Sequence, residues 1–212
     1  MNSLPDIAPT TTGRVLHWAA RYDLLVWLLT HGRHRAFRER LVDLARLAAG
    51  ESILDVGCGT GSLAIAAKRQ VGAGAAVFGI DASPAMIARA TSKAARAGID
   101  VSFKTAVAEA LTFPDAQFDV VLSTLMLHHV PRKVRQQCAG EIRRVLKRHG
   151  RVLVVDFAHA QSKSGLLAHF HHHGHVESRE IIALLDEAGF RCVESGPVGI
   201  SSLQFVLAVP AA

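Results

Sequence analysis

The sequence predicts a doubly wound α/β fold, in which a mostly parallel, seven-stranded sheet is preceded by two N-terminal helices. Between residues 52 and 188, short apolar stretches typical of buried strands alternate with amphipathic helical patterns. This is the order that builds parallel βαβ units. Two further strand patterns, at 191–197 and 202–209, are separated by Gly199. They are close enough in sequence to form an antiparallel pair that closes the sheet.

Two helices are expected before the first strand. Apolar residues recur at helical spacing between residues 14 and 30, and His31-Gly32 ends that pattern. A second amphipathic pattern follows and stops before Gly50. Residues 1–48 are therefore expected to form a helical cover over the remainder of the chain.

Strand and helix patterns then alternate through a core that spans residues 49–212. Five strands are expected at 52–56, 76–80, 101–105, 118–123 and 151–157. Helices are expected at 62–71, 84–97, 131–149 and 177–188. Ser83-Pro84 has the cap and the first-turn proline of a helix start. No linker or internal repeat interrupts the pattern, so a single domain is expected.

The composition is that of a globular protein of 212 residues, half of them hydrophobic and a fifth charged. No apolar run reaches the roughly 18 residues that a membrane span needs. The first dozen residues lack the apolar centre of a signal peptide. The three cysteines are far apart, without a CxxC pair, which indicates a reducing, cytoplasmic environment.

The strongest local signal is the segment 53–61, Ile-Leu-Asp-Val-Gly-Cys-Gly-Thr-Gly. A strand that leads through glycines into a helix lets the backbone approach a ligand closely. A dinucleotide-binding loop needs its third glycine one position later, where Ser62 stands. In addition, Asp55 would place a carboxylate near a pyrophosphate. The loop therefore favours a ligand with a cationic amine.

A second acidic residue, Asp81, follows the second expected strand, about 20 residues beyond the glycines. In doubly wound sheets the ligand lies beyond the carboxyl ends of the strands, and an acid at this position accepts hydrogen bonds from ribose hydroxyls. The alternative is that Asp81 only caps the helix that begins near Ser83. The glycine loop favours the ribose role.

These segments resemble the class I S-adenosylmethionine-dependent methyltransferases, which have a Rossmann-like fold. The resemblance extends over about residues 41–190. It is carried by 53–61, by Gly79-Ile-Asp81, by Phe118-Asp-Val-Val121, by Leu127-His-His-Val130 and by Glu187-Ala-Gly-Phe190. The last two segments are similar to the small-molecule branch that includes quinone and phospholipid N-methyltransferases. The resemblance implies S-adenosyl-L-methionine as cofactor and a small, apolar or amphipathic acceptor.

The resemblance also implies a set of cofactor contacts. Asp55 would contact the amine of the methionine moiety, directly or through water, and Asp81 the ribose. Val107 stands where relatives commonly carry an Asp that accepts a hydrogen bond from the adenine amino group. Valine cannot accept this hydrogen bond, and its loss is expected to weaken cofactor binding by about 1 kcal/mol. The residues expected to line the cofactor are Tyr22, Asp55, Gly57, Cys58, Gly59, Gly61, Asp81, Ala82, Met86, Ala108, Glu109 and Ser123.

Two histidines, His128 and His129, follow the fourth expected strand and are the candidate catalytic residues. Methyl transfer from a sulfonium needs mainly in-line placement. A general base helps only when the acceptor must lose a proton, and the pKa range of histidine suits that role. The alternative is that one histidine packs behind the loop and the other caps the next helix.

Two further groups of residues have less specific signals. The segment 169–175, His-Phe-His-His-His-Gly-His, is interpreted as a substrate-facing loop or plain surface, because it lacks the ligand pattern of a metal site. Trp18, Tyr22 and Trp27 would line the acceptor cover, with Tyr22 reaching the cofactor. An aromatic stripe at this spacing is also compatible with ordinary core packing.

The formal net charge of +6 leaves an anionic membrane surface open as a partner, whereas no nucleic-acid recognition motif is present. Three alternatives to a methyltransferase of small acceptors stay open. They are a cofactor-binding subunit without catalysis, a phospholipid headgroup N-methyltransferase at a membrane surface, and a nicotinamide-dependent oxidoreductase, which the glycine spacing disfavours. The acceptor atom and the oligomeric state cannot be read from the sequence.

Overall fold

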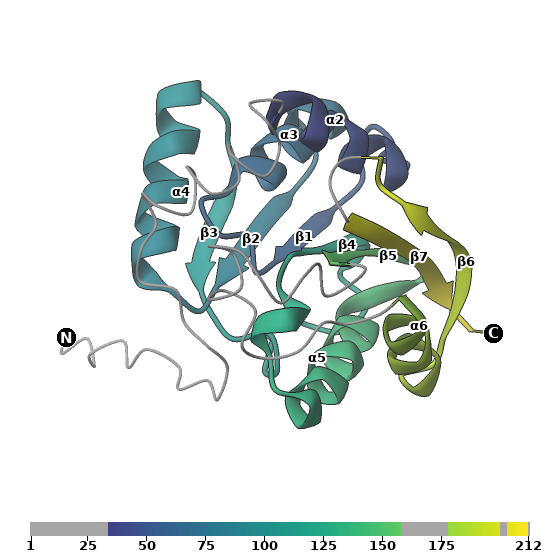
Figure 1. Ribbon diagram of the computed structural model, residues 1–212. Coiled ribbons are helices and arrows are strands. Elements are labelled where there is room, and N and C mark those ends of the chain that lie inside the picture. The colour runs from purple at the N-terminus through teal and green to yellow at the C-terminus, as the bar shows by residue number, and fades with distance from the viewer. Residues whose placement is uncertain (1–33, 158–177, 200–202, 212) are drawn as a thin grey trace, which may run out of the picture.

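The computed structural model describes residues 34–157, 178–199 and 203–211. Its sheet confirms the predicted seven-stranded, mostly parallel arrangement, with strand order β3-β2-β1-β4-β5-β7-β6 (Figure 1). The strands are β1 (Ile53–Val56), β2 (Val77–Asp81), β3 (Ser102–Thr105), β4 (Phe118–Thr124), β5 (Leu146–Phe157), β6 (Phe190–Pro197) and β7 (Leu203–Pro210). Strands β1 to β5 are parallel, and β7 pairs antiparallel with both β5 and β6.

Helices cover both faces of the sheet (Figure 1). They are α2 (His34–Leu44), α3 (Ser62–Val71), α4 (Pro84–Ala97), α5 (Arg132–Val145) and α6 (Ser178–Glu187), with a short 3₁₀ helix, η1 (Leu127–His129). Apolar residues of α2 and α3 contribute to one buried cluster with the sheet, and those of α5 and α6 contribute to a second. The second N-terminal helix is thus present as α2, whereas the first, expected at 14–30, lies outside the described residues.

The expected helix 131–149 is too long at its C-terminal end. Helix α5 stops at Val145, and β5 starts at Leu146, which pairs with Phe118 at the beginning of β4. The next pair is Val120 with Arg151, so the register of the two strands shifts between these pairs. A Cβ atom at Gly150 would lie 2.8 Å from the carbonyl oxygen of Asp119, so a glycine is needed where the two strands come close. Tertiary pairing therefore overrides the helical pattern of this segment.

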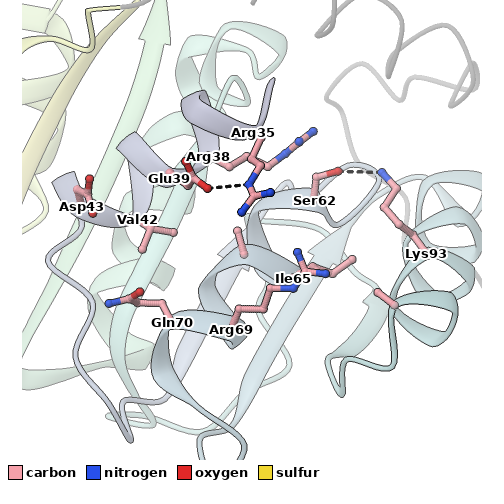
Figure 2. Close-up of a pocket in the computed structure, with 12 residues that line it drawn as sticks. Arg35, Arg38, Glu39, Val42, Asp43, Ser62, Ile65, Arg69, Gln70 and Lys93 are labelled. Atoms are coloured by element: carbon pink, nitrogen blue, oxygen red, sulfur yellow. Dashed lines mark hydrogen bonds and ion pairs between the residues drawn. The ribbon is translucent and has the colours of Figure 1, made fainter. Parts of the chain in front are cut away.

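A polar groove of about 440 Å³ lies between α2, α3 and α4 (Figure 2). Its cationic side chains come from all three helices: Arg35, Arg38, Arg69 and Lys93. Lys93 Nζ donates to Thr60 Oγ1 at 2.7 Å and to Ser62 Oγ at 2.8 Å, so the groove reaches the end of the glycine loop. Two carboxylates, Glu39 and Asp43, also line it.

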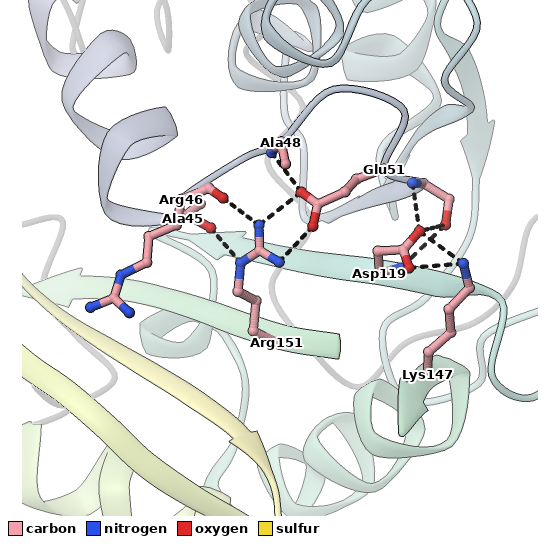
Figure 3. A network of polar contacts seen from close by, with 8 residues as sticks. Ala45, Arg46, Ala48, Glu51, Asp119, Lys147 and Arg151 are labelled. Carbon is pink, nitrogen blue, oxygen red and sulfur yellow. Dashed lines mark hydrogen bonds and ion pairs between the residues drawn. The ribbon is translucent and has the colours of Figure 1, made fainter. Parts of the chain in front are cut away.

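A network centred on Arg151 ties the turn after α2 to β5 (Figure 3). The guanidinium pairs with both carboxylate oxygens of Glu51, at 2.7 and 2.8 Å, and donates to the carbonyl oxygens of Ala45 and Arg46. Burial raises the pKa of Glu51, but hydrogen bonds from Arg151 and from the backbone of Ala48 outweigh it, so the pKa falls below its ordinary value. The carboxylate is therefore ionised and fully paired.

A second polar cluster joins β4 to the segments before β1 and after α5 (Figure 3). Asp119 accepts hydrogen bonds from the backbone and hydroxyl groups of Ser52 and from Lys147 Nζ, which lies 2.8 Å from both carboxylate oxygens. Burial raises the pKa of Asp119, and these donors lower it further than burial raises it.

In the described part of the chain, no helix has both the length and the apolar content to cross a membrane.

Candidate functional site

The candidate site lies at the carboxyl edge of the sheet, where β1, β2, β4 and β5 end side by side. Neighbouring strands fix this arrangement: Val56 is in register with Ile80 on one side and with Ser123 on the other, and Ser123 is in register with Val154. Parallel strands present their carboxyl ends to one edge, which is where doubly wound folds bind ligands. The register therefore brings together most of the residues predicted from the sequence.

The glycine loop after β1 depends on glycine for conformation and for space. Gly57, Gly59 and Gly61 have φ angles of 74°, 53° and 74°, in the left-handed region that other residues rarely adopt. A Cβ atom at Gly57 would lie 2.5 Å from Cγ of Met126, and one at Gly61 would lie 2.5 Å from the ring of Phe103. The loop thus packs against the turn after β4 and against β3.

Asp55 lies in β1 directly before this loop and is only 2 % exposed. Burial raises its pKa to about 7, and the nearby Asp81 carboxylate adds to the rise, whereas a hydrogen bond from the backbone of Ala64 opposes it. Its Oδ2 atom has no hydrogen-bond partner among the described residues. A buried carboxylate oxygen without a donor indicates a missing partner, and an ammonium group of a ligand would provide one.

Asp81 connects the glycine loop to the start of α4. Its Oδ2 atom accepts from the Gly59 N–H and its Oδ1 atom accepts from the Ser83 N–H, both at 2.9 Å. Burial raises the pKa of Asp81, and these two donors oppose the rise. Each carboxylate oxygen can accept a second hydrogen bond. The contact with the helix start is therefore present, and the ribose contact stays a prediction that this geometry permits.

Three buried polar atoms without partners gather at the same edge. Among the described residues of β1 and β4, these atoms are Asp55 Oδ2, Ser123 Oγ and Thr124 Oγ1. Buried polar groups in folded proteins are nearly always hydrogen-bonded. Their concentration at the carboxyl edge is compatible with a polar ligand, and the contact of Ser123 with a cofactor stays a prediction.

The predicted adenine side of the site is mostly apolar. Val107 is buried and, as a valine, provides no acceptor for an amino group. The Ala106 N–H donates to the carbonyl oxygen of Asp81 at 3.1 Å, which places the loop that contains Ala108 and Glu109 beside the end of β2. Met86 and Cys58 are also buried there. Burial raises the pKa of the Cys58 thiol, so this cysteine is not expected to be reactive.

His128 and His129 lie on η1, and the structure gives them different surroundings. His128 Nδ1 lies 2.7 Å from Oδ1 of Asp156, a buried carboxylate at the end of β5. The ring of His129 lies against that of His128, with 3.9 Å between centroids, and the Phe157 ring meets His128 edge-on at 5.2 Å. No role was predicted for Asp156 from the sequence. The signal that could have found it is its position at the end of the strand next to β4.

Arg135 is a second residue with a role that the sequence did not indicate. It is buried on α5, and its Nε atom donates to the carbonyl oxygens of Leu127 and Val130 at 3.0 and 2.9 Å. Burial lowers the pKa of Arg135, while the carboxylates of Asp156 and Glu180 oppose this. The guanidinium thereby holds both ends of the turn that carries the two histidines.

Some predicted residues lie outside the described part of the chain. These are Tyr22, with Trp18 and Trp27, and the histidine-rich segment 169–175. Within residues 34–157, 178–199 and 203–211, no group of three His, Cys, Asp or Glu side chains could hold a metal ion. The groove of Figure 2 contains none of Asp55, Asp81 or His128 and is a separate feature beside the site.

The known proteins with similar sequences are methyltransferases. The family described as methyltransferase domain matches residues 53–150. The chain is 42 % identical over 139 residues to a demethylmenaquinone methyltransferase of Thermus thermophilus, covering 66 % of this chain and 62 % of that protein. It is 35 % identical over 147 residues to the ubiquinone/menaquinone biosynthesis C-methyltransferase UbiE of a Marinomonas species, covering 68 % and 58 %. The chain thus spans about three fifths of the length of these relatives.

A similarity to solved structures supports the fold. The crystal structure of a SAM-dependent methyltransferase from Aquifex aeolicus superimposes with a TM-score of 0.74 at 21 % sequence identity. The superposition covers 90 % of this chain and 97 % of that one. At this level of identity the likeness shows a common architecture, and the function has to be argued from the site.

Proposed function

From the match of residues 53–150 to the methyltransferase domain family and the similarity to quinone methyltransferases, we propose that the chain is a class I S-adenosylmethionine-dependent methyltransferase that acts on a small, apolar or amphipathic acceptor. The cofactor of this domain is S-adenosyl-L-methionine, whose sulfonium supplies an already activated methyl group. S-adenosyl-L-homocysteine is the product.

One observation carries the proposal: Asp55 and Asp81 flank a glycine loop that is tied to both strands. The unpartnered Oδ2 of Asp55 fits the ammonium group of the methionine moiety, and Asp81 keeps acceptor capacity for ribose hydroxyls. The Gly57 and Cys58 N–H groups both donate to the Ile80 carbonyl, which fixes the loop for its ligand. These residues bind and orient, and positioning is expected to provide most of the rate enhancement.

The acceptor class is inferred from the relatives. Their names describe methylation of demethylmenaquinone and C-methylation in ubiquinone and menaquinone biosynthesis, and we propose a quinone-type ring as the acceptor of this chain. The buried apolar residues around the end of β4, Leu125 and Leu127, are compatible with such a ring. His128 and His129 stay the candidate catalytic residues.

The first prediction tests the cofactor assignment. Asp81→Ala should weaken the binding of S-adenosylhomocysteine at least tenfold in calorimetry, because it removes the ribose acceptor and one anchor of the glycine loop. The matched control is Asp100→Ala, which removes an exposed carboxylate and should leave the dissociation constant unchanged. An equal constant for wild type and Asp81→Ala would reject the ribose contact.

The same samples separate the proposal from its alternatives. Transfer of a labelled methyl group to a naphthoquinol supports the enzyme, and binding without transfer to any of a broad set of acceptors supports a non-catalytic cofactor-binding subunit. Transfer to phosphatidylethanolamine vesicles would instead support a headgroup N-methyltransferase. Displacement of S-adenosylhomocysteine by NADH would support an oxidoreductase, which the glycine spacing disfavours.

A further inference from the structure

A buried carboxylate at the end of β5, that of Asp156, contacts the histidine His128 through both of its oxygens. Both oxygens of Asp156 contact His128: Oδ1 lies 2.7 Å from the ring Nδ1, and Oδ2 accepts from the His128 N–H at 3.2 Å. Oδ1 also accepts from the Phe157 N–H at 2.9 Å. Asp156 is 1 % exposed, and the ring it holds is 13 % exposed. Both carboxylate oxygens therefore contact His128, whose side chain keeps part of its surface exposed.

This geometry selects one tautomer of His128. An ionised carboxylate can only accept, so Nδ1 must carry the proton. In the neutral imidazole the lone pair is then on Nε2, which can accept a proton from another molecule. The rings of His129 and Phe157 both contact the imidazole and restrict its orientation.

The turn that carries His128 is held rigidly. Leu125 has a φ angle of 56°, a left-handed conformation that costs an L-residue about 1 kcal/mol, and its N–H donates to the carbonyl oxygen of Val155 at 2.8 Å. Arg135 then binds the carbonyl groups at both ends of η1. Backbone strain of this kind persists where surrounding contacts enforce it, and it concentrates at functional sites.

The same turn packs against the cofactor loop. Met126, two residues before His128, lies so close to Gly57 that a Cβ atom there would be 2.5 Å from Met126 Cγ. The glycine loop and the His128 turn therefore form one contact surface at the carboxyl edge. This places the histidine beside the predicted cofactor site.

We propose that His128 is the general base of the methyl transfer, that Asp156 is its positioning residue, and that the acceptor loses a proton from an O–H group or an electron-rich ring carbon. The inference rests on the proposed function. The acceptor atom forms a bond to the methyl carbon while the methyl–sulfur bond breaks and its electron pair stays on sulfur. The acceptor's proton passes to Nε2 of His128, and the resulting imidazolium pairs with Asp156. Water then removes the proton.

Charged groups from each neighbouring element act on this pair. Asp156 from β5 pairs with the imidazolium, and the positive charge of Arg135 from α5 interacts favourably with the Asp156 carboxylate. Glu180 from α6 and Arg132 from α5 act on Arg135 in opposite directions. A tertiary amine or a thioether has no proton to lose, so an acceptor of that kind would make no use of the pair.

The test combines three variants with one readout that is independent of turnover. His128→Gln should lower kcat by about 10²–10⁴-fold, with the dissociation constant of S-adenosylhomocysteine unchanged. Asp156→Asn should also lower kcat with little change in KM, since its amide favours the His128 tautomer that carries the proton on Nε2. His149→Gln changes an exposed histidine of β5 outside the site; it is the matched control and should stay within about threefold of wild type. Activity of wild type should fall at acidic pH, and the residual activity of His128→Gln should lack this acidic limb.

Nitrogen-15 NMR of the histidine rings keeps the proposal testable if a variant loses activity by unfolding. In the wild type, His128 should show a protonated Nδ1 and an unprotonated Nε2, and this pattern should change in Asp156→Asn. The acceptors to be compared are 1,4-naphthoquinol, 1-naphthol and N,N-dimethylbenzylamine, a tertiary amine without an O–H group. A His128→Gln enzyme with wild-type kcat, transfer to the tertiary amine alone, or the opposite tautomer would overturn the inference. Failure of wild type to bind S-adenosylhomocysteine would instead overturn the proposed function.

Discussion

At the scale of single residues, Asp55 illustrates a conflict between stability and function. Burial raises the pKa of its carboxyl to about 7, from an ordinary 3.8. Unfolded chains release this proton near pH 3.8, whereas the folded chain keeps it up to about pH 7. The stability that this group contributes is therefore fully present below pH 3.8 and is lost as the pH rises through 7. A cationic ligand needs the ionised form, which is the form that destabilises the empty protein.

Asp55→Asn tests both sides of this conflict. At pH 8 its free energy of unfolding should exceed that of the wild type by about 1–3 kcal/mol, since a neutral amide replaces a buried charge. The difference should shrink as the pH falls toward 5. S-adenosylhomocysteine should bind more weakly to the variant. Urea unfolding at several pH values measures the first effect, with Asp100→Asn as an exposed control. A stability difference that does not vary with pH would contradict the shifted pKa.

The residues that the sequence could predict are those that lie within one continuous segment or at a fixed distance from it. The glycine loop, Asp55 and Asp81 are of this kind. The contact between His128 and Asp156 was not predicted, because 28 residues separate them and only the register of β4 with β5 brings them together. Val107 was identified from the sequence as a departure from the family pattern. Its side chain is buried and provides no acceptor for the adenine amino group.

At the scale of elements, the structure depends on polar contacts that join segments far apart in sequence. Arg151 and Glu51 are only 17 % and 19 % exposed and lie 100 residues apart. Arg35 and Glu39, in contrast, form an ion pair within α2 whose side chains are 88 % and 59 % exposed. The two pairs have similar chemistry and differ mainly in burial. They therefore allow a direct test of which polar contacts stabilise the fold.

Arg151→Met should lower the free energy of unfolding by about 2–4 kcal/mol, because it leaves Glu51 and two carbonyl groups without their donor. Arg35→Met should change it by less than about 1 kcal/mol, since exposed pairs are screened by water. Chemical denaturation of both variants gives the comparison. Equal losses would show that the network of Figure 3 does not join α2 to the sheet in the way described.

Element boundaries were harder to predict than element types. The segment 146–150 continues the pattern of α5, and its Lys147 and Arg148 are good helix formers. It becomes a strand because the N–H groups of Ala116 and Gln117 bind the carbonyl groups of Arg144 and Val145, which ends the helix beside β4. Such contacts are nonlocal and leave no signal in the periodicity of one segment.

At the scale of the whole molecule, the alternation of strands and helices was sufficient to predict the sheet. It predicted seven strands and a closing antiparallel pair, and the structure confirms both. The sequence also gave the net charge of +6, but not where the charge lies. The structure places Arg35, Arg38, Arg69 and Lys93 around one groove between α2, α3 and α4. An apolar, quinone-type acceptor is concentrated in membranes, so this basic face is proposed to meet an anionic bilayer.

Sedimentation with vesicles tests this proposed association. The protein should bind vesicles of phosphatidylcholine with phosphatidylglycerol, and should not bind phosphatidylcholine alone. Each cation near an anionic surface is worth about 1 kcal/mol, so replacing Arg35, Arg38 and Arg69 by Gln should weaken binding by about 100-fold. The control replaces Arg132, Lys133 and Arg148, exposed residues on and after α5, by Gln and removes the same charge. Equal losses in both variants would mean that net charge alone attracts the protein, and the groove would have no specific part in membrane contact.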